Sequence, residues 1–482
     1  MRLQSLIEGI TPLRPVAGNP EVTDICFDSR KVGQGSCFVA QVGTRLDGHD
    51  YIPTAVQRGA AAVVCQRMPE EEYEGVAIVL VENSDYALGV MADNWYSHPS
   101  RRLKLVGITG TNGKTTTVTL LHRLFRAMGC HAGLLSTIVN KIDDDEVPAT
   151  HTTPDALELN ALLARMVEAG CQYAFMEVSS HSVVQNRIAG LTFAGGIFSN
   201  LTHDHLDFHK TMANYIAAKK MFFDHLPATA FALVNVDDRN GRVMVQNTKA
   251  KVSTYSLQRM ADFRCRVMEE TFGGTLLEMD GHEVYARLVG RFNAYNLTAI
   301  YGAAVLLGVE RPLALRLLST LEAAEGRFQY VNLDGITAIV DYAHTPDALQ
   351  NVLETINDIR TAGQQLLTVV GCGGDRDKTK RPEMAKIACT MSDRLVLTSD
   401  NPRTEDPESI LDDMEAGLTL EEKSRTVRIT DRRQAIKTAV MMAHEGDIIL
   451  VAGKGHEKYQ DINGVKHHFD DKEELLKLKT EN

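Results

Sequence analysis

The residues best suited to chemistry are Lys114 and Thr115, which follow a glycine-rich turn. The turn Gly110-Thr111-Asn112-Gly113 joins an apolar run, residues 103–108, to a helical pattern. In such a loop the backbone N–H groups and the helix N-terminus bind phosphate oxygens, the lysine reaches the terminal phosphates, and the next hydroxyl ligates Mg²⁺. Gly110 lies closer to Gly113 than the strict G-x-x-x-x-G-K-[ST] spacing requires. The strand–loop–helix setting still predicts a nucleoside triphosphate site.

Two polar clusters follow later strand patterns. Glu177 comes directly after the run 173–176, where it could meet a triphosphate-bound Mg²⁺, although the same residues could instead cap a helix. Residues 200–209 contain three histidines and two aspartates. Zinc would explain that density, but zinc centres usually add cysteine or a distant ligand pair, and neither is evident. A second Mg²⁺ position or the polar wall of an active site is therefore favoured.

Two further candidates are weak when taken alone. Lys219 and Lys220 lie in a helical pattern over 215–223, where lysines ordinarily form a solvated face. Asp341 and His344 end the run 336–340 just before Pro346. Their place after a predicted hinge would let them close over a bound nucleotide.

The elements that position these residues alternate between strands and helices. Strand patterns at 173–178, 195–198 and 231–236 alternate with helices such as 155–169, which predicts a mainly parallel sheet. Near the C-terminus the runs 366–370, 394–397 and 447–451 each end in a polar turn. Ligands of open α/β sheets bind beyond the carboxyl ends of the strands, so we expect these turns to converge on a site.

The chain length and the positions of turn-forming residues predict an α/β protein of three domains. A chain of 482 residues is too long for a single hydrophobic core. Pro99 disfavours helix at His98, which places a first boundary there, and a second boundary is expected at 326–335. A small α/β domain is expected over 1–98, with a helix near 85–96. A central P-loop-type domain with a mainly parallel sheet is expected over 99–330, and a Rossmann-like domain over 331–482.

Composition excludes several classes of protein. The formal charge of −12 disfavours nucleic acid as a partner. The eight cysteines show no C-x-x-C pair and are expected to be reduced thiols. The N-terminus lacks a signal-peptide pattern and no apolar run approaches 18 residues, so no membrane insertion is expected. A cytoplasmic protein, expected to be a monomer, fits best.

Seven motifs together resemble the Mur ligases of peptidoglycan synthesis, and the resemblance covers nearly the whole chain. They occur in the family's order at residues 110–116, 177–181, 200–209, 292–296, 326–327, 341–344 and 453–457. Within the family the chain is similar to the ligases that attach a diamino acid to UDP-N-acetylmuramoyl-L-alanyl-D-glutamate. The turn 400–403, with its arginine, implies meso-diaminopimelate rather than L-lysine.

The resemblance implies that ATP phosphorylates the D-glutamyl γ-carboxylate and that the amine attacks the acyl phosphate. It implies catalytic roles for Lys114, Glu177, His205 and Lys219. Mg²⁺ ligands would be Thr115, Glu177, His205 and a CO₂-derived carbamate on Lys219, which requires a buried, neutral amine. Nucleotide contacts would come from Gly110, Thr111, Asn112, Gly113, Lys114, Thr115, Thr116, Asn293, Arg327, Asp341 and His344.

The resemblance also implies two sets of substrate contacts. An N-terminal UDP-sugar-binding domain and the central domain would hold the sugar nucleotide through Ser29, Thr44, Arg45, Leu46, Thr152, Thr153, Ser179, Gln185 and Arg187. The C-terminal domain would hold the amino acid through Arg381, Asp400, Asn401, Pro402, Arg403, Gly453 and Glu457. A guanidinium can bind the distal carboxylate of diaminopimelate, which lysine lacks.

Three alternatives remain open at this point. A lysine-adding ligase is opposed by Arg403, and folylpolyglutamate synthase by the separate N-terminal domain with Asp28-Ser29-Arg30. A nucleotide-binding regulatory protein that has lost catalysis is opposed by the intact motif residues.

Overall fold

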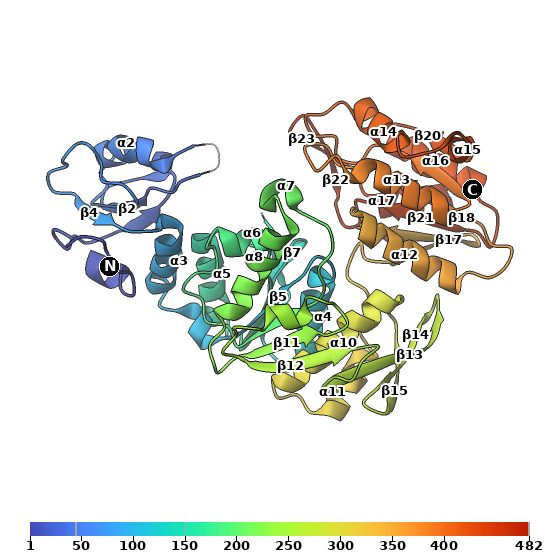
Figure 1. The fold of residues 1–482 in the computed structure, drawn as a ribbon, viewed down its shortest axis with the longest axis horizontal. Helices are drawn as coiled ribbons and strands as arrows, with labels where there is room; N and C mark the ends of the chain where they lie inside the picture. Colours follow the sequence, from blue (N-terminus) through green and yellow to red (C-terminus); the bar gives the residue numbers. More distant parts are fainter. Residues whose placement is uncertain (44–45, 150, 481–482) are drawn as a thin grey trace.

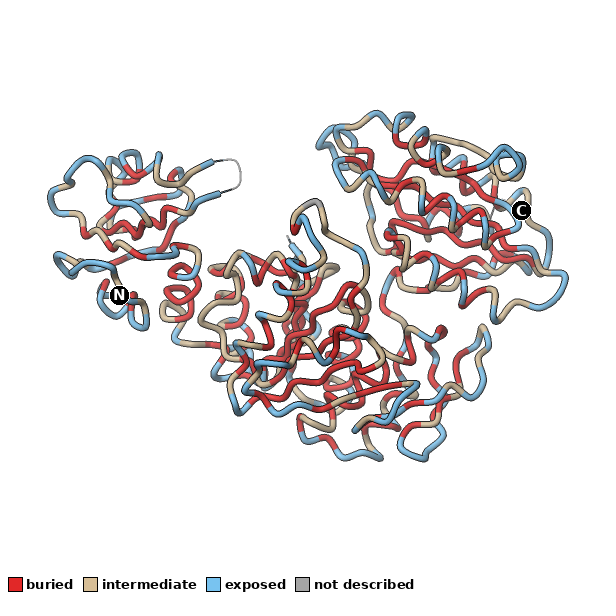
Figure 2. Tube along the Cα trace, viewed as in Figure 1, coloured by how far each residue is buried: buried red, intermediate tan, exposed pale blue. Residues whose placement is uncertain are grey.

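The chain folds into three successive bodies, each built on its own sheet (Figure 1). The computed structural model describes residues 1–43, 46–149 and 151–480. Buried residues gather on the strands of each body and on the helix faces turned toward them (Figure 2). The predicted three-domain α/β fold is thereby confirmed. None of the described helices is long and apolar enough to cross a membrane.

The N-terminal body is a four-stranded parallel sheet with helices on both faces. Helix α3 leads from it into the central body, where its buried residues share a cluster with Ala156 (Figure 1). Its strands are β1 (Asp24–Cys26), β2 (Ser36–Val39), β3 (Ala62–Cys65) and β4 (Ala77–Leu80), and its helices are α1 (Leu3–Leu6), η1 (Ser29–Lys31), η2 (Gly48–Tyr51), α2 (Ile52–Gln57) and α3 (Ser84–Trp95).

Between the first two bodies the chain bends sharply. Ser97 and His98 both have left-handed φ angles, 59° and 54°, and His98 Nδ1 lies 2.6 Å from Asp93 Oδ2. A short helix, η3 (Pro99–Arg102), follows. The predicted break at Pro99 is therefore a fixed turn.

The central body holds an eleven-stranded sheet in the order β15-β14-β13-β12-β11-β10-β5-β9-β6-β7-β8. The interior strands are parallel, whereas the hairpins at both edges are antiparallel. The strands are β5 (Lys104–Thr109), β6 (Ala132–Leu135), β7 (Val139–Ile142), β8 (Asp145–Pro148), β9 (Tyr173–Glu177), β10 (Gly195–Phe198), β11 (Phe231–Asn235), β12 (Lys251–Ser256), β13 (Phe263–Thr271), β14 (Gly274–Met279) and β15 (His282–Ala286).

Helices cover both faces of this sheet. Residues of α4, α10 and α11 pack on one face, and residues of α5, α6, α8 and α9 pack on the other. The helices are α4 (Lys114–Ala127), α5 (Ala156–Glu168), α6 (Ser180–Val184), α7 (Leu206–His209), α8 (Met212–Asp224), α9 (Gly241–Met244), α10 (Arg291–Leu306) and α11 (Arg311–Leu318).

The C-terminal body has a six-stranded sheet in the order β16-β17-β21-β18-β19-β20, parallel except for the edge strand β16. Helices α12, α13 and α14 pack on one face, and α16 and α17 on the other. Its elements are β16 (Gln329–Leu333), β17 (Ile336–Asp341), α12 (Pro346–Ile359), β18 (Leu366–Val370), α13 (Lys380–Met391), β19 (Arg394–Leu397), α14 (Pro407–Glu415), α15 (Leu420–Ser424), β20 (Thr426–Arg428), α16 (Arg432–Met442), β21 (Ile448–Ala452), β22 (Tyr459–Ile462), β23 (Val465–His468) and α17 (Asp471–Thr480).

Strand β16 was not predicted. It lies inside the segment read as a boundary, and it pairs antiparallel with β17. The third sheet therefore begins at Gln329, before the boundary expected at 330. This strand pairs with β17 across the tight Asp334-Gly335 turn, where both residues have positive φ, and it buries Val331 and Leu333.

Two glycines let helix α8 approach the sheet closely. A Cβ on Gly107 of β5 would lie 2.7 Å from Phe222 Cζ, and a Cβ on Gly196 of β10 would lie 2.9 Å from Phe222 Cε1. The ring of Phe222 therefore fills the space that side chains would otherwise occupy. This contact fixes the depth at which α8, which carries Lys219, packs on the sheet.

We expect Gly107→Ala to destabilise the protein by about 1–3 kcal/mol, because the new methyl group overpacks a rigid aromatic contact. The midpoint of thermal unfolding measures the effect. The control is Gly33→Ala, where the new Cβ would have Ser36 Oγ at 3.9 Å as its nearest neighbour. A Gly107→Ala protein that unfolds at or above the wild-type midpoint would contradict this packing argument.

Candidate functional site

The glycine-rich loop between β5 and α4 has the geometry of a phosphate cradle. Gly113 precedes α4 with a φ of 86°, and Gly110 has a φ of 156°. A Cβ on Gly110 would lie 1.9 Å from Ser199 Oγ, and one on Gly113 would lie 2.4 Å from Asn296 Oδ1. Both positions therefore exclude larger residues, and the backbone N–H groups at the start of α4 stay available to an anion.

Lys114 is folded back over this loop. Its Nζ donates to the carbonyl oxygens of Gly110 and Thr111, at 2.9 and 2.8 Å. Burial lowers the pKa of its ammonium, while the charges of Glu177 and Asp204 oppose that shift. A cation held at the mouth of an anion-binding loop is the arrangement predicted for contact with terminal phosphates.

The segment after β10 braces the loop from beside it. Asn200 Oδ1 accepts from the backbone N–H of Asn112 at 2.9 Å, and Ser199 Oγ donates to the carbonyl of Asn112 at 2.7 Å. Behind Gly113, Asn296 Nδ2 donates to Asn293 Oδ1 at 3.1 Å. Asn293 is thus placed behind the loop, as part of its support. Thr116 is buried in the first turn of α4.

Glu177 ends β9 with one carboxylate oxygen satisfied and one not. Its Oε1 accepts from the backbone N–H of Thr137 at 2.8 Å, and its Oε2 is buried with no hydrogen-bond partner among the described residues. A buried carboxylate oxygen without a donor is costly. A hard cation would satisfy it, so Glu177 fits the predicted Mg²⁺ role.

The histidines of residues 200–209 do not gather into one ligand set. His205 Nε2 lies 3.4 Å from Asp204 Oδ2, His203 Nε2 lies 3.9 Å from Asp377 Oδ2, and His209 Nε2 lies 2.8 Å from Ser180 Oγ. Burial lowers the pKa of His205 to about 4, against the opposing charge of Asp204, and a neutral imidazole is the form that binds metals. Among the described residues no group of three or more His, Cys, Asp or Glu side chains could hold a metal ion.

Lys219 lies on α8 with its side chain 1 % exposed. Its Nζ donates to the carbonyl of Gly110 at 2.9 Å and lies 4.7 Å from the centre of the Tyr215 ring. Burial, reinforced by the charge of Lys114, lowers the pKa of Lys219 well below its ordinary value. Its neighbour Lys220 instead pairs with Asp224 at 2.6 Å. The two lysines, equivalent in the sequence pattern, therefore differ completely in setting.

Two residues, Arg327 in the linker and Asp347 in the C-terminal body, contact the phosphate loop. Arg327 Nη2 lies 3.3 Å from Thr115 Oγ1, and its guanidinium stacks 4.5 Å from the centre of the Tyr342 ring. Asp347 Oδ2, on α12, accepts from Asn112 Nδ2 at 2.7 Å and from Thr202 Oγ1 at 3.3 Å. The two bodies thus meet at the loop itself.

Asp341 anchors the linker at the end of β17. Its carboxylate accepts from the backbone N–H groups of Phe328, at 2.7 Å, and Ala343, at 2.8 Å. Phe328 has a left-handed φ of 47°. Asp341 therefore holds a strained linker in place, while His344, two residues beyond Tyr342, is exposed and bonds the Tyr342 carbonyl through Nδ1 at 2.9 Å.

The residues predicted to bind the sugar nucleotide divide between two bodies. Thr153 Oγ1 donates to the carbonyl of Glu177 at 2.8 Å and lies 3.4 Å from Ser179 Oγ, and Arg187 Nη1 donates to the carbonyl of Thr153 at 2.7 Å. Thr152, which bonds Thr137 at 3.1 Å, and Gln185, at the end of α6, lie in the same central-body segments. Ser29 and the exposed Leu46 lie in the N-terminal body, and Thr44 and Arg45 fall outside the described residues.

The predicted convergence of the C-terminal turns is confirmed. A Cβ on Gly453 would lie 2.6 Å from Asp400 Oδ2 and 3.6 Å from the carbonyl oxygen of Gly371. Asn401 Nδ2 donates to Glu457 Oε2 at 2.7 Å. Lys454, fully buried, donates to Asn401 Oδ1 at 3.1 Å and lies 3.3 Å from Glu457 Oε2. The turns after β18, β19 and β21 therefore form one acidic cluster with a buried lysine.

Two arginines near this cluster have opposite settings. Arg381 is fully buried, and its terminal nitrogens bind Glu405 and Asp413, each at 2.8 Å. Arg403, beyond the buried Pro402, has a left-handed φ of 53° and donates through Nη1 to the carbonyl of Gly374 at 2.7 Å. Among the described residues Arg403 has no ion pair with a carboxylate. Arg403 is therefore open to a carboxylate of a ligand, whereas Arg381 is already paired with two carboxylates of the protein; both stay predicted amino-acid contacts.

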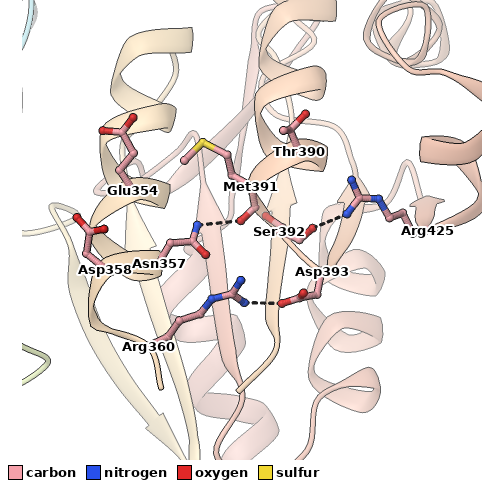
Figure 3. Close-up of a pocket in the computed structure, with 9 residues that line it drawn as sticks. All are labelled: Glu354, Asn357, Asp358, Arg360, Thr390, Met391, Ser392, Asp393 and Arg425. Atoms are coloured by element: carbon pink, nitrogen blue, oxygen red, sulfur yellow. Dashed lines mark hydrogen bonds and ion pairs between the residues drawn. The ribbon is translucent and has the colours of Figure 1, made fainter. Parts of the chain in front are cut away.

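A separate hollow of about 420 Å³ lies where α12 and α13 end (Figure 3). Asn357 donates to the carbonyl of Met391 at 2.9 Å, Arg360 pairs with Asp393, and Arg425 donates to the carbonyl of Ser392 at 2.9 Å. None of the predicted site residues lines it. Asn357, Arg360 and Arg425 thus pair with other lining residues, and we do not assign the reaction to this hollow.

Three residues close to the site were not among the predicted site residues. Asn200 was seen only as part of a motif, and Asp347 directly follows Pro346 in the predicted turn, so both had a signal that could have been used. Lys454 was read only as part of a substrate loop. Its complete burial becomes visible only in the folded structure.

Comparison with known proteins agrees with this geometry. Family models match residues 21–96 ("Mur ligase family, catalytic domain"), 108–304 ("Mur ligase middle domain") and 326–455 ("Mur ligase, glutamate ligase domain"). The chain is 56% identical over 480 residues to a UDP-N-acetylmuramoyl-L-alanyl-D-glutamate–2,6-diaminopimelate ligase of Parabacteroides distasonis, covering 99% of each chain. It is 57% identical over 476 residues to the ligase of the same name from Cytophaga hutchinsonii, covering 98% of each. A solved structure of a ligase of that name aligns with a TM-score of 0.71 at 33% identity, covering 100% of this chain and 99% of the other.

Proposed function

The chain belongs to the Mur ligase family, and from that premise we propose that it joins meso-diaminopimelate to the D-glutamyl γ-carboxylate of UDP-N-acetylmuramoyl-L-alanyl-D-glutamate. The observation that carries the proposal is the end-to-end likeness to diaminopimelate ligases, which spans 99% of both chains. The reaction is an ATP-dependent C–N ligation in peptidoglycan precursor synthesis. We place it in the cytoplasm, where ATP is available, and infer a monomer because one chain supplies all three substrate regions.

In the proposed reaction the γ-carboxylate oxygen attacks the γ-phosphorus of ATP, and ADP leaves. The amine nitrogen then attacks the acyl carbon, phosphate leaves, and the amine loses a proton to form the amide. The phosphate loop binds and orients the triphosphate, and Lys114 offsets its charge. Thr115, Glu177 and His205 would hold Mg²⁺, which supplies charge neutralisation at the transferring phosphoryl group when bound.

Lys219 would react with CO₂ to give a carbamate and one released proton. Two observations favour this modification: the amine is completely buried, and the charge of Lys114 beside it disfavours a second ammonium. A carbamate would convert that repulsion into attraction, and it would add an anionic oxygen ligand close to the phosphate loop.

The C-terminal cluster suits a diamino acid with two carboxylates. Asp400 and Glu457 offer negative charge to an ammonium group, and Arg403 offers a guanidinium to the distal carboxylate. L-Lysine would leave Arg403 without that partner. This contrast favours meso-diaminopimelate over the lysine-adding alternative, and the intact site residues disfavour an inactive regulatory protein.

The proposal is tested by phosphate release from ATP with Mg²⁺ and UDP-N-acetylmuramoyl-L-alanyl-D-glutamate. Meso-diaminopimelate, L-lysine and no amino acid are compared. We expect strong release and tripeptide product only with diaminopimelate. A preference for lysine would overturn the Arg403 argument, and release that does not depend on any amino acid would overturn the ligase.

We expect Lys219→Ala to lower kcat by at least ~100-fold, about 2.7 kcal/mol of transition-state stabilisation, because no carbamate can form. Added bicarbonate would not restore activity, whereas acetate would restore part of it. Lys220→Ala is the matched control, since Lys220 pairs with Asp224 on the same helix. Full activity of Lys219→Ala in steady-state assays would exclude the carbamate.

We expect Arg403→Ala to raise the KM for diaminopimelate by about 10- to 150-fold, the loss of one hydrogen-bonded charge contact. The KM for ATP should change less than about threefold. Arg394→Ala, on an exposed side chain at the opposite end of β19, is the control. Equal rises in both KM values would show that Arg403 does not select the amino acid.

A further inference from the structure

A completely buried ion pair lies behind the amino-acid cluster. Arg432, the first residue of α16, and Asp471, the first residue of α17, both have side chains that are 0 % exposed. Arg432 Nε and Nη2 each donate to Asp471, at 2.7 Å. A buried pair of this kind gains little net stability over a well-packed apolar pair, so stability alone does not account for it.

Arg432 also reaches the strand ends from which the two substrate loops begin. Its Nη2 donates to the carbonyl of Ala452 at 3.0 Å, and its Nη1 lies 3.5 Å from the carbonyl oxygen of Ser399. Ala452 immediately precedes Gly453, and Ser399 immediately precedes Asp400. One rigid guanidinium thus fixes the starting points of both loops.

The charge of Arg432 also bears on the cluster. It interacts favourably with Asp400 and with Glu457, which repel each other. Lys454, whose Nζ lies 3.3 Å from Glu457 Oε2, supplies a second buried positive charge beside Glu457. Without Arg432 the two carboxylates would face more mutual repulsion in a buried setting.

We propose that Arg432, oriented by Asp471, is a positioning residue for the amino-acid substrate, setting the spacing of the loops that carry Asp400 and Glu457. The inference rests on the proposed function, because it takes this cluster as the diaminopimelate site. It makes helix α17 part of the site's framework, although no residue of α17 was predicted to contact a substrate. Arg432 touches no reacting atom and acts through the loops.

The test uses the full-length protein with Arg432→Lys and Asp471→Asn. The lysine keeps the charge, but its single ammonium cannot donate two parallel hydrogen bonds to Asp471 and a third to the carbonyl of Ala452 in the same geometry. The asparagine keeps the shape and removes the charge that orients the guanidinium. Arg433→Met is the matched control, because Arg433 joins the same two helices through Glu474 at 2.7 Å but lies 57 % exposed.

The measurements are kcat, the KM values for diaminopimelate and ATP, and the thermal midpoint. We expect both variants to raise the diaminopimelate KM by about 10- to 100-fold, with the ATP KM within about twofold of wild type, as for a lost charged contact. Arg433→Met should leave both KM values unchanged. Equal rises in the two KM values, or a lower thermal midpoint without any KM change, would assign the pair a purely structural role.

Two results separate this inference from the proposed function. Wild-type phosphate release that does not depend on diaminopimelate would defeat the function itself. If the wild-type reaction depends on diaminopimelate but the variants raise the KM values for diaminopimelate and ATP equally, only the positioning role is overturned. If Arg432→Lys does not fold, Asp471→Asn decides the question, since it leaves the arginine in place.

Discussion

The burial of the Lys219 amine against the phosphate loop is the constraint on which the rest of the site depends. An ammonium removed from water without a counter-ion is strongly disfavoured, so the group must be neutral, modified or compensated. The fold maintains this burial through Gly107 and Gly196, whose missing side chains admit the ring of Phe222. A sheet with larger residues at those positions would hold α8 further away, and Lys219 would then reach water rather than the carbonyl of Gly110.

The same loop is also the point at which the central and C-terminal bodies are joined. Arg327 contacts Thr115, and Asp347 accepts from Asn112, so groups from beyond the central sheet lie against the nucleotide loop. Asp341 fixes the linker that carries Arg327. A triphosphate in the loop would bring its own negative charge toward the Asp347 carboxylate. Nucleotide binding and the relative placement of the two bodies are therefore coupled by electrostatics at one short segment.

Much of this arrangement could be predicted from sequence, and the exceptions have physical causes. Buried parallel strands are continuous apolar runs, so β10, β18 and β19 were predicted with their observed ends. Strand β16 was missed because its segment was read as a domain boundary, and the hairpin β22–β23 because its residues are mostly polar and exposed. The candidate site residues in glycine-rich or acidic turns were predicted from spacing and resemblance. The sequence did not reveal which of these residues are buried, and burial is what distinguishes Lys219 from Lys220.

The arginines of the C-terminal body show most clearly what sequence alone cannot decide. From the sequence, the resemblance predicted amino-acid contacts for Arg381 and Arg403, and nothing singled out Arg432. In the structure Arg381 is neutralised by Glu405 and Asp413, and Arg432 by Asp471, whereas Arg403 has no carboxylate partner among the described residues. Two buried guanidiniums thus have carboxylate partners within the protein, whereas Arg403 donates to the carbonyl of Gly374. The proposed selectivity for a second carboxylate rests on that division of charge, which arises from contacts between residues distant in the chain.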